Sequence, residues 1–298
     1  MHLGITTPAV TLFPGACSPW EETAGIDDIA RIAFTADRLG FNHITCSEHV
    51  AVPADIAAER GGTYWDPLAT LGYLAARTDR IRLVTQVLVL GYHHPLEIAK
   101  RYGTLDVVSG GRLTLGLGVG SLKEEFDLLG VPFEDRGPRA DDALAALRAA
   151  LSRTQPEYHG TYYRFSDFVV QPHAAQPRVP LWVGGRTRRS LRRAIEHGDG
   201  WVPFGLSHPD LRSMLATADV PARFEIVLSV GAQLDPIADS DGAISALREV
   251  SRAGATIAGV GLSARDADHY CEQMVRLREI ALDEGHDFPD KFESPPGQ

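Results

Sequence analysis

His49 is the residue of this sequence whose type and position most directly suggest chemistry. It follows Glu48 at the end of an apolar segment, residues 41–46, that we predict to be a strand. Histidine titrates near neutral pH, so a side chain at this place is suited to give or accept a proton during a reaction. The alternative is a histidine that only caps a polar loop.

A second candidate site follows the predicted strand 180–184 and consists of Gly184, Gly185, Arg186 and Thr187. Two glycines that open a helix, with Arg188 and Arg189 close by, are what phosphate capture requires, because helix N-terminal N–H groups and guanidinium groups both attract anions. Ser121 similarly follows the predicted strand 113–119 at the start of a helix. The alternative is a solvated, arginine-rich helix face, which is how we interpret Arg192 and Arg193.

Two other motifs are rejected on spacing. His43, Cys46 and His49 suggest a metal site, but residues 43 and 46 of one strand face opposite sides, and we expect no metal. Residues 116–120 suggest a dinucleotide fingerprint, but the third glycine comes one place too early and the glycines lie within a strand.

The elements that must position these residues form a repeating strand–helix pattern. In residues 81–125, an apolar β-branched segment (81–90) leads into a helix (95–108) with apolar residues near a 3.6 period. The helix stops at Ser109, Gly110 and Gly111, and a second apolar strand (113–119) follows. Strands of this type are parallel and buried on both faces, and chemistry sits at their carboxyl ends.

The whole chain repeats this unit until a barrel can close. The predicted strands are residues 3–7, 41–46, 81–90, 113–119, 180–184, 200–204, 223–230 and 256–262. We therefore predict a single (β/α)8 TIM barrel domain over residues 1–298, with a β-hairpin insertion around 157–172 and a frayed C-terminal tail at 286–298. Asp27 or Asp28 is expected to cap the first helix, and Asp66-Pro67 to open the next one.

Composition restricts the partners. The chain has 298 residues, a net charge of −10 and three cysteines (Cys17, Cys46 and Cys271). An acidic chain offers no electrostatic footprint for nucleic acid, and no apolar run approaches the length of a membrane span. No signal peptide is evident and the sparse cysteines suit a reducing compartment, so we expect a cytoplasmic protein without a disulfide framework.

Several motifs together resemble a known family. Residues 95–126 carry a Pro followed by AK, TLD, SGGR, LGLGVG and EEF. In order along the rest of the chain stand GFNHITCSEHV at 40–50, DPLATLGYLAARTDRIRL at 66–83, FDLLGVPFEDRG at 126–137 and LWVGGRTRRSLRRAIEHGDGW at 181–201. This pattern resembles the bacterial luciferase-like monooxygenase superfamily, the flavin- and deazaflavin-dependent (β/α)8 barrels, and most of all the actinobacterial branch presumed to use coenzyme F420.

The resemblance implies a cofactor site at the carboxyl end of the barrel. A non-prolyl cis peptide at Gln86–Val87, next to Thr85, would form a bulge that supports the ring system. Gly118 and Gly120 would let the backbone approach a flat tricyclic ring, which we favour for Gly120; the alternative is close packing at the barrel wall. The phosphate would bind at 184–187. The resemblance further implies that His49 faces the reactive edge of the cofactor and that Glu48 orients or tunes His49. His93 and His94 would lie at the rim of the site, and Glu125 would bond to loops.

We therefore predict an oxidoreductase that transfers a hydride between C5 of coenzyme F420 and a small organic substrate, with His49 moving the accompanying proton. An FMN-dependent monooxygenase that uses reduced flavin and oxygen is the first alternative, and a non-catalytic flavin-binding barrel is the second. The substrate is set by loops 8–20, 51–65, 131–138 and 205–210. The aromatic residues that could line its pocket, or fill the core, are Trp20, Tyr64, Trp65, Tyr92 and Trp201. By resemblance, the default assembly is a homodimer.

Overall fold

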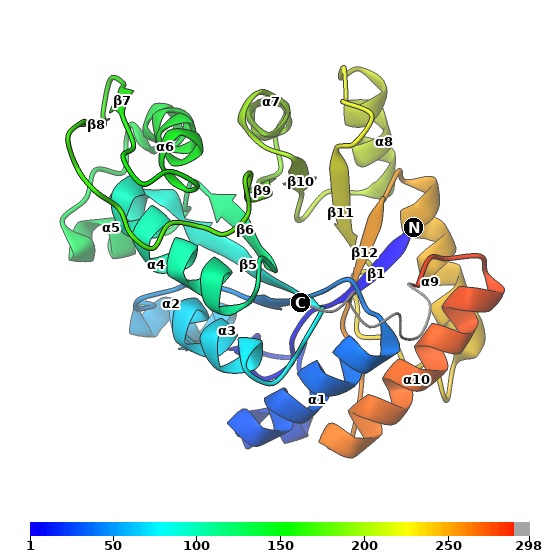
Figure 1. Ribbon diagram of the computed structural model, residues 1–298. Coiled ribbons are helices and arrows are strands. Elements are labelled where there is room, and N and C mark those ends of the chain that lie inside the picture. Colours follow the sequence, from blue (N-terminus) through cyan, green and yellow to red (C-terminus); the bar gives the residue numbers. More distant parts are fainter. Residues whose placement is uncertain (289–298) are drawn as a thin grey trace, which may run out of the picture.

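Eight parallel strands close into a barrel in the computed structural model, which describes residues 1–288 (Figure 1). Their order around the barrel is β1, β12, β11, β10, β9, β6, β5 and β3, and the pairing of Ile5 with Ile44 joins the last to the first. The strands are β1 (His2–Ile5), β3 (His43–Cys46), β5 (Arg82–Val89), β6 (Leu113–Gly118), β9 (Leu181–Gly184), β10 (Gly200–Val202), β11 (Glu225–Ser229) and β12 (Ile257–Val260). Each overlaps one of the predicted strand segments, so the (β/α)8 barrel is confirmed.

Helices surround this barrel (Figure 1). They are α1 (Ile26–Leu39), α3 (Pro67–Ala75), α4 (Pro95–Val108), α6 (Arg136–Ala150), α7 (Arg188–His197), α8 (His208–Ala216), α9 (Ser240–Arg252) and α10 (Ala267–Asp283). Short pieces outside the repeat are η1 (Pro19–Glu22), α2 (Ala54–Arg60), η2 (Leu90–Tyr92) and α5 (Lys123–Leu129). Among the helices of residues 1–288, none combines the length and apolar composition that crossing a membrane requires.

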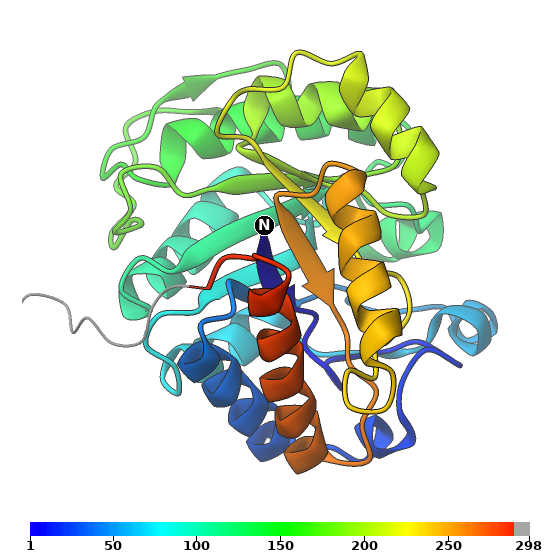
Figure 2. The same cartoon turned by 90° about the vertical axis from the view of Figure 1, so that its right-hand side faces the viewer.

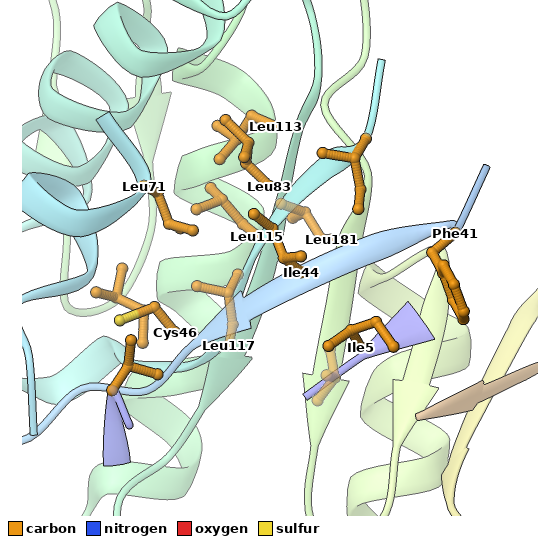
Figure 3. Packing of buried hydrophobic residues seen from close by; sticks show 14 of the residues in the cluster. Ile5, Phe41, Ile44, Cys46, Leu71, Leu83, Leu113, Leu115, Leu117 and Leu181 are labelled. Carbon is orange, nitrogen blue, oxygen red and sulfur yellow. The ribbon is translucent and has the colours of Figure 1, made fainter. Parts of the chain in front are cut away.

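Successive residues of a strand point to opposite sides, and the two sides form separate apolar layers. Leu83, Leu113 and Leu181 belong to the large cluster between strands and helices (Figure 3). Their neighbours face the barrel interior, where the buried side chains of Val84, Trp182, Val202, Val227 and Ile257 form a second cluster. Burial on both faces explains why the strands are continuously apolar rather than alternating.

Local signals set most helix ends. Asp66 caps α3 by accepting a hydrogen bond from the Ala69 N–H, and Pro67 is the first helical residue, as predicted. Gly110 and Gly111 both have positive φ, as the end of α4 requires. The start of α1 differs from the prediction: Gly25 is the N-cap, and Asp28 accepts a hydrogen bond from the Gly25 N–H from the third helical position.

A polar plug fills the amino-terminal end of the barrel. Arg82 makes two hydrogen bonds with Glu225, at 2.8 and 3.1 Å, and the Trp182 indole donates to the same carboxylate at 2.6 Å. His43 lies beside Trp182, fully buried, and burial together with the charge of Arg82 lowers its pKa to about 3. His43 therefore stays neutral at the opposite end of β3 from His49.

The C-terminal segment packs beside this plug as far as the structure describes it. The Asp287 N–H donates to the Met1 carbonyl, and the Phe288 ring packs against Phe41, with 5.3 Å between ring centroids. The rest of the predicted tail, residues 289–298, lies outside the described residues.

Two excursions leave the barrel. The hairpin predicted around 157–172 is present and pairs β7 (Tyr158–His159) with β8 (Arg164–Phe165). Asp142 holds the turn between β7 and β8, because its carboxylate accepts hydrogen bonds from the Tyr162 and Tyr163 N–H groups. The predicted loop 51–65 contains α2 and β4 (Thr63–Tyr64), and β4 pairs antiparallel with β2 (Thr11–Leu12).

Gly116→Ala tests the close contact between β5 and β6. A Cβ at Gly116 would lie 2.0 Å from the carbonyl oxygen of Thr85, so we expect the free energy of unfolding to fall by about 1–3 kcal/mol in urea denaturation. Gly72→Ala in α3 is the matched control: nothing lies within 4 Å of its Cβ, and we expect a gain of about 0.5–1 kcal/mol. Equal stability of the two variants would contradict this packing.

Candidate active site

The carboxyl ends of β3, β5, β6 and β9 bring most of the predicted site residues to one face of the barrel. Glu48 and His49 follow β3, Gln86 and Val87 lie in β5, and residues 118–121 and 184–187 end β6 and β9. Figure 2 shows β11 (yellow) and β12 (orange) running toward the side from which α2 (blue) projects, which is this same carboxyl face.

The peptide between Gln86 and Val87 is cis, as expected from the family resemblance. Pairing between β5 and β6 is regular up to Thr85 and resumes at Leu88, so the strand bulges between them. The Ser47 hydroxyl donates to the Gln86 carbonyl at 2.8 Å, and the Thr85 hydroxyl donates to the Gly116 carbonyl at 2.8 Å.

The glycines beside the bulge make room for Val87. A Cβ at Gly118 would lie 2.7 Å from one methyl group of Val87, and a Cβ at Gly184 would lie 3.1 Å from the other. Gly120 has φ of 78°, and a Cβ there would lie 2.6 Å from the Phe126 ring. On the side that a side chain would occupy, Gly118 and Gly120 therefore serve close packing. Any approach of a flat ring to these glycines would use their other side.

His49 is held by Glu125 of α5. The imidazole Nδ1 lies 2.7 Å from Glu125 Oε2, and the Glu125 side chain is fully buried while that of His49 is 26% exposed. Oε2 also accepts from the Tyr92 hydroxyl at 2.6 Å, and Oε1 accepts from the N–H groups of Val50 and Ala51 at 2.6 and 3.2 Å. A carboxylate offers only acceptors, so Nδ1 must carry the hydrogen and Nε2 remains for another partner.

These contacts keep Glu125 ionised. Burial opposes its charge, but the hydrogen bonds from His49, Tyr92 and the two N–H groups outweigh burial and lower the pKa of this carboxyl below its ordinary value. Burial and the neighbouring Glu125 carboxylate raise the pKa of Tyr92, which therefore stays protonated and donates. Together these groups fix the imidazole in one tautomer and one orientation.

The expected role of Glu48 as the group that orients His49 is wrong. Glu48 Oε1 lies 2.7 Å from His93 Nε2, and Oε2 accepts from the Val89 N–H at 2.7 Å. Successive residues after a strand point in different directions, so Glu48 turns toward β5 whereas His49 turns toward α5. Glu48 thus ties His93 and the end of β5 together, close to the bulge. His94 caps α4 by accepting from the Leu96 N–H, and its ring packs against Tyr163.

The loop after β9 has the character of an anion site in part. Gly185 has φ of 138°, and a Cβ there would lie 2.6 Å from Ser190 Cβ. Thr187 and Ser190 form a reciprocal capping box, so the Thr187 N–H is already used by the Ser190 hydroxyl. The N–H groups of Arg188 and Arg189 in the first turn of α7 have no acceptor within the helix. Arg186 is exposed and stacks over Phe204, 5.9 Å from the ring centroid.

The aromatic residues divide between core and site. Trp201 is fully buried, and Trp20 packs against Tyr270, so both fill the core. Tyr92 supports Glu125, and the Tyr64 ring contacts His49 with 4.5 Å between ring centroids. The sequence did not indicate the His49–Glu125 pair or the Tyr64–His49 contact. The family resemblance implied only that Glu125 bonds to loops, and its contacts with the Val50 and Ala51 N–H groups are of that kind.

Comparisons with known proteins identify the family and the fold of this chain. The sequence profile of the family described as luciferase-like monooxygenase matches residues 7–236, which is most of the chain. A monooxygenase structure from Streptomyces bottropensis superposes with a TM-score of 0.76 at 24% identity, covering 96% of this chain and 100% of that one. At this identity the superposition shows a common fold.

Two sequence relatives differ in the cofactor that their names give. An F420-dependent glucose-6-phosphate dehydrogenase of Microbacterium testaceum is 28% identical over 194 residues, covering 64% of this chain and 56% of its own. The oxygenase component of a flavin-dependent trigonelline monooxygenase of Acinetobacter baylyi is 27% identical over 175 residues, covering 58% of this chain and 46% of its own.

Glu125→Ala should destabilise the protein strongly, because it leaves two N–H groups and the Tyr92 hydroxyl without their acceptor. We expect the free energy of unfolding to fall by about 3–5 kcal/mol in urea denaturation. Glu124→Ala, at the exposed neighbouring position, should change it by less than about 0.5 kcal/mol. Similar losses in both variants would show that Glu125 does not organise the site.

The His93–Glu48 pair should make stability depend on pH. Burial lowers the pKa of His93, but the hydrogen bond and charge of Glu48 and the charge of Glu97 outweigh this and raise it above 6.5. Because the pKa of His93 is raised in the folded state, the pair contributes fully to the free energy of unfolding below pH 6.5. This contribution disappears as pH rises through the folded-state pKa. The difference in Tm between the native protein and His93→Gln should therefore shrink from pH 6 to pH 9; a constant difference would argue against a charged pair.

Proposed function

Because the chain belongs to the luciferase-like monooxygenase family, we propose that it is an oxidoreductase that transfers a hydride between C5 of coenzyme F420 and a carbon of a small organic substrate. The observation that carries this proposal is the imidazole of His49. Its Nδ1 is committed to a buried carboxylate, which leaves Nε2 for another partner, and Ser47, two positions earlier, contacts the cis-peptide bulge.

The residues present fit a coenzyme with a flat ring and a phosphate. Val87 fills the space that Gly118 and Gly184 leave, which makes the bulge a firm apolar shelf on which a ring can rest. Thr85 and Gln86 hold that shelf through backbone contacts with β6 and Ser47. The first turn of α7 and Arg186 would hold the phosphate, with Gly184, Gly185 and Thr187 shaping the turn. Ser121 follows β6, the strand that pairs with β9, and would contribute its backbone.

When bound, the coenzyme supplies a carbon that accepts or donates a hydride. The protein supplies the proton movement and the geometry. During oxidation of an alcohol, the hydroxyl proton would pass to His49 Nε2 as the hydride leaves the carbon, and the product is a carbonyl compound. Glu125 stabilises the resulting imidazolium, because its carboxylate already accepts from Nδ1. Glu48 acts less directly, by holding His93 and the end of β5.

An FMN-dependent monooxygenase is the second candidate. The trigonelline monooxygenase relative is flavin-dependent by name, and an apolar shelf suits a flavin ring as well as a deazaflavin ring. The homodimer and the cytoplasmic location stay predictions.

A binding titration against coenzyme F420 and FMN in parallel tests the proposal. We expect F420 to bind saturably, as measured by the quenching of its fluorescence. We expect FMN not to bind at the same concentrations. Binding of FMN alone would establish the second candidate, and binding of neither would refute both.

His49→Ala tests the assigned proton transfer. Turnover should fall by about 10²–10⁴-fold, while the Kd for the coenzyme changes only about two- to threefold. His159→Ala, at an exposed position of the hairpin, is the control and should keep full turnover. Unchanged turnover in His49→Ala would remove this residue from the mechanism.

A further inference from the structure

Two segments that are distant in sequence form a cap over His49. The loop after β1 and the segment between β3 and α3 meet in the small β2–β4 ribbon, where Thr11 pairs with Tyr64 and Leu12 with Thr63. The Trp65 N–H also donates to the Val10 carbonyl at 3.0 Å. Gly61 permits this closure, because its φ is 78° and a Cβ there would lie 1.8 Å from the Leu12 carbonyl oxygen. Figure 2 shows α2, the middle of this cap, projecting beyond the barrel.

Glu21 anchors the first segment of the cap. Its buried carboxylate accepts from the Ala9 N–H at 3.0 Å, the Ser18 N–H at 2.8 Å and the Gln233 amide at 2.8 Å. Gln233 follows β11, the second strand from β1 around the barrel, so the loop after β1 is fastened to the loop after β11. The cap therefore has a defined shape in front of the site.

This cap presents aromatic rings to the space beside His49. Tyr64 contacts the imidazole directly, and Phe13 packs edge-on against Tyr64, with 6.2 Å between ring centroids and 89° between ring planes. Phe13 is nevertheless 48% exposed. A large aromatic side chain that is held in place by a neighbouring ring but left half open offers an apolar surface to a ligand.

The charges around the cap disfavour an anion. The ionised carboxylate of Glu125 contacts His49, and α2 exposes Asp55 and Glu59. Arg60, an exposed cation at the end of α2, lies close to Tyr64. Burial raises the pKa of Tyr64, and the charge of Arg60 offsets part of this rise. The arginines of the α7 region follow β9, three strands from β3 around the barrel, at the place proposed for the phosphate.

We infer that the non-reacting part of the substrate is apolar and uncharged, with an aromatic ring as its best match, and that Phe13 and Tyr64 select it. This inference rests on the proposed function for the place of the reacting centre, which is His49. It assigns to this chain a substrate unlike a sugar phosphate, whose charge would meet Asp55 and Glu59 of α2, which outnumber Arg60.

Titration of the full chain with two matched probes tests the inference. The probes are the neutral ketone 2-acetonaphthone and the anion 2-naphthoate, and calorimetry measures their Kd with and without coenzyme F420. The native protein should bind the ketone saturably and at least about fivefold more tightly than the anion. In NMR of protein with ¹³C-labelled histidine, the ketone should shift the His49 signal, which His49→Ala identifies.

Phe13→Ala should weaken binding of the ketone about tenfold, as expected for the loss of one stacked aromatic ring. Phe168→Ala is the matched control, because Phe168 is similarly exposed at 59% but lies outside the cap, and this variant should bind like the native protein. Equal binding by the two variants, tighter binding of the anion, or no saturable binding of the ketone would each overturn the inference. Failure of coenzyme F420 to bind would refute the proposed function separately, since the probe titration without coenzyme is judged by itself.

Discussion

The buried carboxylate of Glu125 is the constraint on which the site depends. An ion removed from water is tolerated only if its oxygens are fully hydrogen-bonded, and Glu125 meets this condition through His49, Tyr92, Val50 and Ala51. These donors come from the segments after β3 and β5, while Glu125 itself comes from the helix after β6. The need to satisfy one charge therefore brings three neighbouring strand ends into a single arrangement.

At the opposite end of the barrel, a second carboxylate is also satisfied by hydrogen bonds from several strands. Arg82 and Glu225 satisfy one another across the interior, and Trp182 both donates to the carboxylate and stacks against the guanidinium, 4.9 Å from its ring centroid. This plug fixes β5, β9 and β11 at the end where no reaction is expected. The carboxyl ends of the strands are then free to carry loops of variable shape, which is the general division of labour in (β/α)8 barrels.

The carboxyl face combines a network of backbone contacts with the cap to which we assign substrate choice. In the network, Glu48 holds the end of β5, Ser47 holds the Gln86 carbonyl, and Val87 fills the gap between two glycines. The cap adds Tyr64, which contacts His49, and Phe13, which packs against Tyr64. The group assigned to proton transfer therefore also adjoins the surface assigned to substrate choice.

The sequence alone determined the barrel, because strand and helix periods, glycines with positive φ and the Asp66-Pro67 start are local signals. The strand pattern also placed His49 at a carboxyl end, and the family resemblance implied the bulge at Gln86–Val87. Only the tertiary structure decided which carboxylate holds His49. Glu48 is adjacent in sequence but turns to His93, whereas Glu125, 76 positions away, makes the contact. Adjacent residues diverge in direction and distant ones converge at a barrel mouth, so partners follow from strand pairing and helix packing rather than from sequence distance. The cap could not be predicted for the same reason, because its ribbon pairs residues 11–12 with the distant residues 63–64.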